Sequence, residues 1–381
     1  MPSIDKPRIV QLVREDIPAV KAFLRETYGP GFYGADDDYF DWFYLKNPCL
    51  WFAPRLAEGI IPVNAILSER RQIAALHAYL PFDAITPWGG QIGVWDIEWI
   101  NGSGIRGAGR ALVRHLLQGI DIYAGFGCNE LSENAFRKIG LEVKPEIPRC
   151  VWMVDAEGWA RVAESAGIPP GMGGNRTQKR HIGDRHYHRI PLGSVPDRVL
   201  EESLSSSQMG VTRRRTWLNW RYVQHPFIRY DIIGADPDGL GGVAVVRVEN
   251  IAGTEQTVCR ILDLLTEKNG LPRLLTGILA FANREGCLLV DYFTTAESVA
   301  GRLVAASSVA GFEALRNPPL PFMFQPLAMS GRNSINFVAS VGAQVPQPID
   351  FGGFYATKAD ANQDILRSTH NAPVLKPAAI P

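Results

Sequence analysis

Three things are scarce in this chain of 381 residues: net charge, cysteine and long apolar runs. The 39 Lys and Arg residues balance the 39 Asp and Glu residues, so the composition shows no basic coat for nucleic acid or a membrane surface. The five cysteines are scattered without a CxxC pair, which argues against a disulfide or zinc framework. No stretch approaches the ~18 apolar residues of a membrane span, and the start lacks the apolar core of a signal peptide. We therefore expect a cytoplasmic protein without a metal, nucleic acid or membrane partner.

The length suits two domains of ordinary size, and 46% hydrophobic residues suffice for each to bury a core. Two short segments echo each other: residues 41–48 read DWFYLKNP and residues 219–226 read NWRYVQHP, with Trp, Tyr and Pro matched. A second echo, Gly-Leu-Glu at 140–142 and Gly-Phe-Glu at 311–313, follows at a similar spacing. Two pairs of similar segments in the same order predict a duplicated unit of about 150 residues.

Strand-like and helix-like segments alternate in the first unit. A strand over 8–12 precedes an amphipathic helix from Asp16, and a second helix over 35–45 ends at Asn47-Pro48. Alternating residues predict half-buried strands over 73–80 and 91–101. After these we expect a helix over 108–118, a strand over 120–128, a helix over 130–139 and a final strand over 143–154.

The segment GSGIRGAG at 102–109 lies between a predicted strand and a predicted helix. Glycine leaves backbone N–H groups open to a ligand, and a helix N-terminus favours anions, so the segment predicts a phosphate site. Its first six letters also satisfy the GxGxxG dinucleotide fingerprint. However, the preceding strand carries Asp96 and Glu98, and no acid ends the next strand, so the context argues against a dinucleotide. The remaining alternative is that the glycines only allow a tight turn.

The run GIRGAGRALVRHL resembles the pyrophosphate loop of the GNAT acyltransferases, which reads Gln/Arg-x-x-Gly-x-Gly/Ala before a helix. Gly107 and Gly109 take the two small positions, whereas Gly104 stands where the family has Gln or Arg. At the family's later spacings this chain has Asn129, Ser132, Phe136, Gly140 and Leu141. The resemblance covers residues 8–155. It implies a tandem GNAT fold of the α/β (α+β) class, with two mixed, mostly antiparallel sheets flanked by helices.

The resemblance implies acetyl-CoA, or another acyl-CoA, as cosubstrate. Loop and helix amides would bind its pyrophosphate, with added charge from Arg106 and Arg110, and a backbone N–H near Trp99 or Ile100 would hold the thioester oxygen. The tyrosine that protonates the departing thiolate in many members is Phe136 here, and a phenyl ring cannot donate a proton. The predicted cosubstrate-binding residues are Trp99, Ile100, Gly104, Ile105, Arg106, Gly107, Ala108, Gly109, Arg110, Asn129 and Phe136.

Acyl transfer to an amine needs a base that takes a proton from the nitrogen. Asp96 and Glu98 are two residues apart on one expected strand. That spacing predicts that both point to the same face, with Trp95, Ile97 and Trp99 on the other. Next to the expected thioester, Glu98 and Asp96 are the candidate catalytic residues, acting directly or through water. The alternative is that both are solvated or paired residues of a polar face.

The second unit resembles the first in a degenerate form. Its strand TVCRILDLL is followed by TEKNGLPRLL, where Pro272 lacks an N–H group, so we expect only the first unit to bind coenzyme A. We expect the chain beyond Ala359 to be loosely packed. The predicted segments are 1–155 (acyl-CoA-binding GNAT domain), 156–200 (basic linker or inserted loop), 201–340 (degenerate GNAT-like domain) and 341–381 (C-terminal extension).

Cationic and aromatic side chains bear on the acceptor. The segment 175–189 and Arg213–Arg215 could hold a phosphate or carboxylate, or form a solvated surface. His181, His186 and His188 lack the spacing of a metal site. The repeated aromatic residues could stack on a sugar or pack in the core. They are Tyr39, Trp42, Tyr44, Trp217, Trp220 and Tyr222.

These observations together predict a bacterial acyl-CoA-dependent N-acyltransferase, in the first instance an N-acetyltransferase, acting on a small-molecule amine. Analogy with tandem members favours an amino sugar, or a nucleotide-linked one, of surface polysaccharide. A catalytically impaired binding or regulatory protein is a second hypothesis, favoured by Phe136 and the degenerate second unit. A Fem-type aminoacyl transferase is a third, and it predicts tRNA binding that weakens with salt. The sequence leaves the oligomeric state open.

Overall fold

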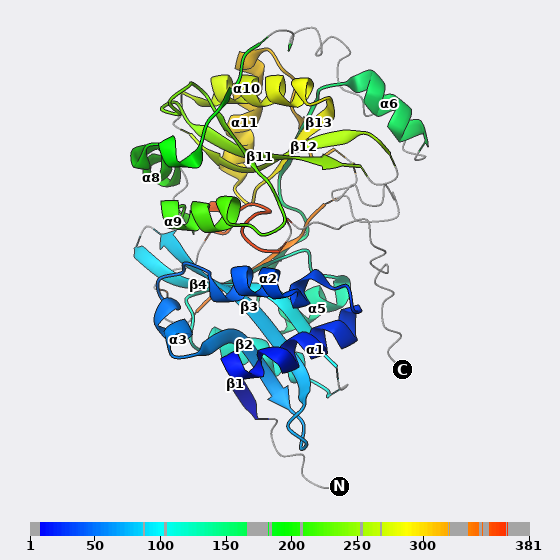
Figure 1. Ribbon diagram of the computed structural model, residues 1–381, viewed down its shortest axis with the longest axis vertical. Helices are drawn as coiled ribbons and strands as arrows, with labels where there is room; N and C mark the ends of the chain where they lie inside the picture. Colours follow the sequence, from blue (N-terminus) through cyan, green and yellow to red (C-terminus); the bar gives the residue numbers. More distant parts are fainter. Residues whose placement is uncertain are drawn as a thin grey trace.

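The chain forms two lobes stacked along the long axis of the molecule, each built on one mixed β-sheet (Figure 1). Lobe 1 is the lower half in Figure 1, from β1 to α5, and lobe 2 is the upper half, which contains α10 and α11. The computed structural model describes residues 8–86, 88–102, 105–165, 182, 185–205, 209–251, 254–266, 269–318, 320, 334–342, 345, 350–362 and 364. For residues 202–205 it describes the backbone alone.

The sheet of lobe 1 has nine strands in the part of the chain that is described. Its path runs β1-β2-β3-β4-β5-β15-β6, with β9 pairing the far end of β3 and β16 pairing β9. Only the β4–β5 and β9–β16 pairs are parallel. The strands are β1 (Ile9–Val13), β2 (Ile60–Leu67), β3 (Ile73–Thr86), β4 (Gly89–Asn101), β5 (Ile122–Phe126), β6 (Glu142–Lys144), β9 (Met209–Val211), β15 (Phe337–Val341) and β16 (Phe354–Tyr355).

Helices cover both faces of this sheet. On one face, called the α1 face, α1 buries Val20 and Leu24 against the strands. On the other, called the α4 face, α4 buries Leu112 and Val113, and α5 buries Phe136. The helices are α1 (Ile17–Tyr28), α2 (Asp37–Phe40), α3 (Ala53–Ala57), α4 (Ala108–Leu117) and α5 (Glu130–Lys138), with short turns η1 (Arg14–Asp16), η2 (Tyr33–Ala35) and the π-helical η3 (Asp41–Leu45).

The sheet of lobe 2 has seven described strands in the order β14-β7-β13-β12-β11-β10-β8, with only β12 and β13 parallel. Both sheets are thus mixed and mostly antiparallel, which confirms the expected fold class. The strands are β7 (Arg149–Met153), β8 (His188–Arg189), β10 (Asp231–Gly234), β11 (Val243–Asn250), β12 (Thr257–Leu265), β13 (Cys287–Phe293) and β14 (Leu315–Arg316). The helices are α6 (Ala156–Ser165), α8 (Asp197–Ser205), α9 (Arg215–Leu218), α10 (Leu271–Arg284) and α11 (Glu297–Ala310), with turns η4 (Leu192–Ser194) and η5 (Asn219–Val223).

The two lobes exchange strands between the two halves of the chain. β7 follows β6 in sequence but lies in lobe 2, between β13 and β14. β15 follows β14 but lies in lobe 1, between β5 and β6. The exchange is reciprocal, so neither sheet is complete without the other half. The domain boundaries expected at residues 155, 200 and 340 stay predictions.

The two echoed sequence segments meet where the lobes touch. The indole Nε1 of Trp42 donates to the carbonyl of Trp220 at 2.8 Å, and the Nε1 of Trp220 donates to the carbonyl of Trp42 at 2.8 Å. Each tryptophan lies in a π-helical turn, and the ring centroids are 5.2 Å apart. This reciprocal pair marks a local two-fold relation between the lobes. It confirms the duplication predicted from the echo.

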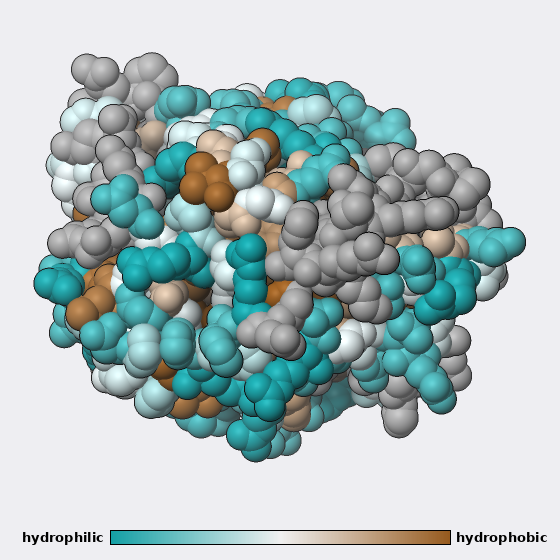
Figure 2. All heavy atoms as spheres, turned by 90° about the horizontal axis from the view of Figure 1, so that it is seen from above, coloured by the Kyte–Doolittle hydropathy of each residue, from teal (hydrophilic) through white to brown (hydrophobic). Residues whose placement is uncertain are grey.

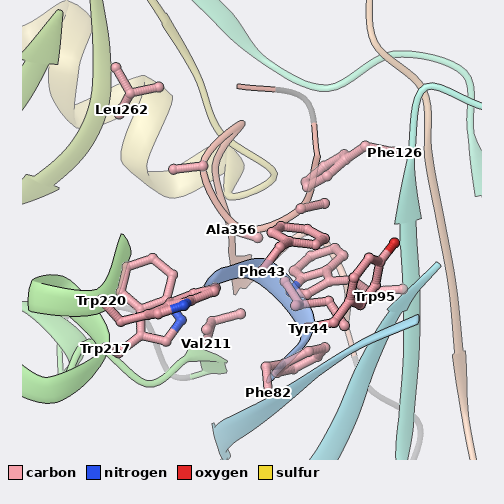
Figure 3. Close-up of a cluster of buried hydrophobic side chains, with 14 of the residues drawn as sticks. Phe43, Tyr44, Phe82, Trp95, Phe126, Val211, Trp217, Trp220, Leu262 and Ala356 are labelled. Carbon is pink, nitrogen blue, oxygen red and sulfur yellow. The ribbon is translucent and has the colours of Figure 1, made fainter. Parts of the chain in front are cut away.

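The aromatic residues around this pair form a core that both lobes share. Trp217 and Trp220 of lobe 2 face Phe43 and Tyr44 of η3, and Trp95 of β4 continues the cluster (Figure 3). The packing alternative for the repeated aromatic residues is therefore confirmed, and stacking on a free sugar is wrong for these side chains. All six are buried: Tyr39, Trp42, Tyr44, Trp217, Trp220 and Tyr222.

Replacing Trp42 with phenylalanine should lower the free energy of unfolding by about 2–4 kcal/mol, because it leaves the buried Trp220 carbonyl without its donor and opens a small cavity. Urea unfolding followed by circular dichroism measures the change. The control is Trp88→Phe at a side chain that is 40% exposed, where a change within about 0.5 kcal/mol is expected. Equal effects of the two variants would contradict a structural role for the tryptophan pair.

Several expected elements differ in the structure. The strand expected over 143–154 is two strands, because Pro145 and Pro148 interrupt the ladder and the chain crosses to the other lobe. Strand β2 was not expected at all. The first ten residues of the expected linker form α6. The tail is also not loose at its start, because Ala359 and Ala361 are buried between the lobes.

The face of lobe 2 that points away from lobe 1 is mostly hydrophilic where it is described, with apolar side chains scattered among polar ones (Figure 2). Among the described residues, no helix is long and apolar enough to cross a membrane.

Candidate functional site

β4 and β5 pair only as far as Asp96 and Gly125 and then separate. From Ile97 to Asn101, β4 keeps β3 as its partner on one side and has no pairing with β5 on the other. We call this opening between the two strands the fork of lobe 1. The strand before the glycine-rich loop therefore splays from its neighbour.

A β-bulge at Ile97 changes the direction of the side chains at the fork. Asp96 pairs with Tyr79 of β3. Glu98 pairs with Ala78, the preceding residue of β3, so Ile97 is the extra residue. Neighbouring residues of β3 point to opposite faces of the sheet, and cross-strand partners share a face. Asp96 therefore lies on the α4 face and Glu98 on the α1 face.

The expectation that Asp96 and Glu98 share one face is thus wrong, and the bulge is the reason. The contacts agree with the register: Asp96 lies 2.9 Å from the imidazole Nε2 of His77 on β3, and Glu98 accepts a hydrogen bond from the hydroxyl of Tyr28 at 2.7 Å. Trp99 also departs from the expected pattern. Its ring packs on the α4 face, whereas Ile97 packs on the α1 face.

The start of α4 offers free backbone donors. Gly107 is the N-cap residue, with a left-handed φ of +83° that favours glycine, and no side chain caps the helix. In the described part of the chain, the N–H groups of Gly107, Gly109 and Arg110 have no hydrogen-bond acceptor. Together with the positive end of the helix dipole, these donors make a suitable anion site.

Packing holds this helix start against the fork. An added Cβ at Gly109 would lie 2.4 Å from the indole Nε1 of Trp99, so the indole can cross the helix start only because position 109 is glycine. The carbonyl of Ile105 accepts from the Asn101 side chain at 2.9 Å and from the Ala108 amide at 3.1 Å. Ala108 is buried beneath the turn.

The other predicted cosubstrate residues lie around this point. Arg106 and Arg110 are exposed, and Arg110 Nη2 lies 3.9 Å from the position of a Cβ on Gly107. Asn129 caps α5 through its side-chain oxygen, which accepts from the Ser132 amide at 2.9 Å. Gly104 lies outside the described residues.

Phe136 and Ile100 lie in the hydrophobic cores on the two faces of the sheet. The Phe136 ring is fully buried behind Trp99, with ring centroids 4.8 Å apart. Ile100 packs in the core of the α1 face. Their predicted contacts with a cosubstrate remain predictions, and for Ile100 they concern only the backbone.

Glu98 is the most strongly perturbed carboxyl at the fork. Desolvation raises its pKa to about 7, the hydrogen bond from Tyr28 opposes this shift, and the charge of Asp96 adds to it. Burial and the neighbouring Glu98 also raise the pKa of the Tyr28 hydroxyl, so Tyr28 keeps its proton. A carboxyl with a pKa near neutrality is suited to accept a proton from an amine.

Lobe 2 has the same bulged strand but a filled fork. The extra residue of β12 is Leu262, so Asp263 corresponds to Glu98 and Leu264 to Trp99. The Leu264 amide, which corresponds to the backbone predicted to hold the thioester, donates to the hydroxyl of Tyr355 at 3.3 Å. Tyr355 also donates to Asp263 at 2.6 Å.

The helix start of lobe 2 is also closed. An added Cβ at Gly270 would lie 1.6 Å from the Gly241 carbonyl, so a turn of the chain itself covers the start of α10. Pro272 removes a donor from its first turn. These contacts support the prediction that only lobe 1 binds a cosubstrate.

The three consecutive arginines expected near an acceptor already have carboxylate partners. Arg213 is fully buried and pairs with Asp263 at 2.5 Å and with Asp360 at 2.6 Å. Arg214 pairs with Asp83 at 3.2 Å, and Arg215 pairs with Asp197 at 2.6 Å. Arg213 and Arg214 thereby join the lobes and the C-terminal segment, whereas Arg215 joins α9 to α8. Sequence reasoning missed this role because the partners lie up to 147 residues away.

The C-terminal segment reaches both forks. After Tyr355, whose hydroxyl fills the fork of lobe 2, the chain continues to Asn362, whose Nδ2 donates to the carbonyl of Ile97 in lobe 1 at 3.4 Å. Two residues later, Asp364 accepts from Tyr230 at 2.6 Å. No motif in the sequence indicated that these residues lie beside the fork.

Among the described residues, no three His, Cys, Asp or Glu side chains gather as metal ligands. His186 and His188 belong to the described part of the chain, whereas His181 lies outside it.

The order of strands and helices in both lobes defines a tandem GNAT fold. No protein-family profile and no curated protein matches the sequence. Among solved structures, the chain is similar to a GCN5-related N-acetyltransferase from Anabaena variabilis ATCC 29413 (TM-score 0.55, 14% identity, covering 88% of this chain and 72% of that chain). It is also similar to a probable N-acyltransferase of unknown function from Enterococcus faecalis V583 (TM-score 0.55, 11% identity, 89% and 73%). A GCN5-related N-acetyltransferase from Kribbella flavida gives a TM-score of 0.51 at 12% identity, over 88% and 70%.

Proposed function

We propose that the protein is an acyl-CoA-dependent N-acyltransferase that works through lobe 1. The observation that carries this proposal is the set of amides at the start of α4 that have no acceptor among the described residues, beside the fork where β4 and β5 separate at Glu98. A pyrophosphate at these amides would receive backbone donors, the helix dipole and the charge of Arg106 and Arg110.

The two faces of the sheet divide the proposed reaction. The amides of α4 lie on the α4 face, so the cosubstrate enters the fork from that face. The acceptor amine then approaches from the α1 face, where Glu98 takes a proton from its nitrogen. The Trp99 amide is the proposed donor to the thioester oxygen, because its counterpart Leu264 directs its amide into the fork of lobe 2.

Acetyl-CoA is the proposed donor, since two of the similar structures are described as N-acetyltransferases. The proposed acceptor is a small-molecule primary amine in the bacterial cytoplasm. Amino sugars and nucleotide-linked amino sugars are the first to test, on the analogy with tandem members. Because Arg213, Arg214 and Arg215 already form ion pairs with carboxylates of the chain, they give no support to a diphosphate bound at those arginines.

Isothermal titration with acetyl-CoA tests the proposal, and we expect one molecule bound per chain. The second fork should contribute nothing, because Tyr355 and the Gly241 turn fill it. A screen of thiol release with amine libraries then tests turnover. Absence of acetyl-CoA binding would contradict the proposal. Binding without turnover on any amine would favour the alternative of a catalytically impaired binding protein. The buried Phe136, which stands in place of a tyrosine, also favours that alternative.

A further inference from the structure

Arg221, in the turn η5 where the lobes touch, is a buried cation without a hydrogen-bonded carboxylate. It is 1% exposed, and its Nε and Nη1 groups have no hydrogen-bond partner in the part of the chain that is described. Its Nη2 donates to the carbonyl of Ala361 at 3.3 Å, and the guanidinium lies 5.3 Å from the ring centroid of Trp42. A buried charge is costly unless it is paired and hydrogen-bonded, so these N–H groups are suited to an anion from outside the chain.

The four other buried arginines among the described residues all form ion pairs with carboxylates, and they are Arg149, Arg213, Arg247 and Arg260. Against the lowering effect of burial, Tyr230 and Asp364 raise the pKa of Arg221, so the guanidinium stays charged. Asp364 is already engaged, however, because it pairs with Arg247 at 2.9 Å and accepts from Tyr230 at 2.6 Å. Arg221 thus differs from the other buried arginines in having donors to offer.

His225 supplies a second unpartnered donor near Arg221. Its Nδ1 accepts hydrogen bonds from the amides of Phe227 at 3.1 Å and Ile228 at 3.0 Å, so the proton of the ring is on Nε2. This Nε2 has no partner among the described residues, and His225 is 8% exposed. Burial and the charge of Arg221 lower the pKa of His225 to about 3, so the ring is neutral at neutral pH. One guanidinium and one neutral imidazole N–H match a group with a single negative charge.

A short stretch of the C-terminal segment links these donors to the fork of lobe 1. The carbonyl that accepts from Arg221 belongs to Ala361, and the next residue is Asn362. The Asn362 side chain donates to the carbonyl of Ile97, the bulge residue, at 3.4 Å. Ile97 directly precedes Glu98, the proposed base.

Tyr39 of α2 shows that the donors and the base face one region between the lobes. Burial raises the pKa of the Tyr39 hydroxyl, the charge of Arg221 lowers it and the charge of Glu98 raises it, so both groups lie near this ring. The ring centroid of Tyr39 is 6.2 Å from that of His225. It is 6.5 Å from that of Phe227, which stacks on it and is 43% exposed. The donors thus lie one layer of side chains beneath the surface.

We propose, on the basis of the proposed function, that Arg221 and His225 bind a carboxylate of the acceptor while the acceptor's amine meets Glu98. The acceptor is then a primary amine that also carries a carboxylate, such as an amino acid or an amino-sugar acid. The Phe227 ring turns outward to admit it.

Both weaker classes of acceptor follow from the same donors. A neutral amine leaves the guanidinium and the imidazole N–H of the site unpaired, and a phosphate brings a second negative charge into a buried region. Arg221 and His225 are therefore specificity-determining residues, and neither takes part in the bond changes of the reaction.

Matched pairs of amines test the inference. Each pair is an amino acid and the amine left when its carboxylate is removed, such as L-histidine with histamine and L-phenylalanine with phenethylamine. Initial rates of thiol release from acetyl-CoA give kcat/KM, and we expect the member with the carboxylate to be preferred at least about a hundredfold. Glucosaminic acid, glucosamine and glucosamine 6-phosphate extend the series to amino sugars, where the carboxylate should again be preferred.

Three variants of the full chain locate the carboxylate. Arg221→Gln should raise the KM of the preferred acceptor about a hundredfold and abolish the preference within each pair, with the Kd of acetyl-CoA unchanged. His225→Asn should raise the same KM about tenfold, because its oxygen can still accept from the Phe227 and Ile228 amides but the Nε2 donor is lost. Arg229→Gln, at an exposed arginine of the same segment, is the control and should leave the preference intact.

Thermal unfolding measures binding without turnover. Arg221→Gln should unfold no earlier than the unmodified chain, because it removes a buried charge that has no bonded carboxylate. The carboxylate-bearing amines should raise the unfolding temperature of the unmodified chain and of Arg229→Gln, but not that of Arg221→Gln.

Equal kcat/KM within the pairs, a preference for the phosphate, or a preference that survives in Arg221→Gln would overturn the inference. The proposed function would stand in each of these cases, because the unmodified chain would still acylate an amine. A chain that acylates no amine overturns the proposed function. The carboxylate site would then stand only if carboxylate-bearing amines still stabilised the unmodified chain and not Arg221→Gln, and without that difference it would fall as well.

Discussion

Replacing Glu98 with glutamine should lower kcat for acyl transfer by at least about a hundredfold, the usual contribution of a positioned base. Glutamine keeps the size of the side chain and its contact with Tyr28 but cannot accept the proton. Because the pKa of Glu98 is raised to about 7, the carboxyl is protonated below that pH. If the proposed function holds, the unmodified protein should therefore lose activity as the pH falls through about 7. Initial rates of thiol release from acetyl-CoA between pH 5 and 9 measure both effects.

Two further variants sharpen this prediction. The Tyr28 hydroxyl opposes the raised pKa of Glu98, so Tyr28→Phe should move the acidic limb to higher pH without removing it. Glu142→Gln, at an exposed carboxyl on β6, should change nothing. If Glu98→Gln kept the rate and the acidic limb of the unmodified protein, Glu98 would not be the base.

Gly109→Val should raise the Kd of acetyl-CoA at least about a hundredfold. A Cβ at this position would lie 2.4 Å from the indole of Trp99 and would push the wall of the fork away from the amides of α4. The loss corresponds to about 2.7 kcal/mol, which is reasonable for a pyrophosphate that loses several backbone donors. Isothermal titration gives the Kd directly.

The control for this variant lies at the other end of the same helix. Gly119 has no atom within 4 Å of an added Cβ, so Gly119→Val should bind acetyl-CoA as the unmodified chain does. Arg110→Glu adds a second measure at an exposed side chain, and a weakening of about tenfold is expected from charge alone. Normal binding by Gly109→Val would mean that the cosubstrate lies elsewhere.

Much of the fold follows from local patterns in the sequence. The echo around Trp42 and Trp220 indicated the duplication, since each segment forms the same π-helical turn in its own lobe. The glycine-rich loop indicated the start of α4, because Gly107 adopts a positive φ and Gly109 lies under an indole. These features depend on a few neighbouring residues, so the sequence carries them directly.

The site depends on features that no local pattern contains. Alternation predicts one face for Asp96 and Glu98, but a single extra residue in the ladder with β3 reverses one of them. Tyr28 and His77 join the site only through the packing of α1 and the register of β3. Tyr355 fills the second fork from 91 residues away. Each of these contacts is set by tertiary structure, which helix and strand propensities and the spacing of residues in the sequence do not predict.

The exchange of β7 and β15 has a consequence for synthesis of the protein on the ribosome. The sheet that carries the proposed catalytic residues lacks a central strand until residues 337–341 have been translated. Until then the neighbouring edges of β5 and β6 expose unpaired backbone groups, which invite aggregation. The N-terminal half of the nascent chain should therefore depend on chaperones for most of translation, and a premature stop codon before Phe337 should inactivate the half that has already been made.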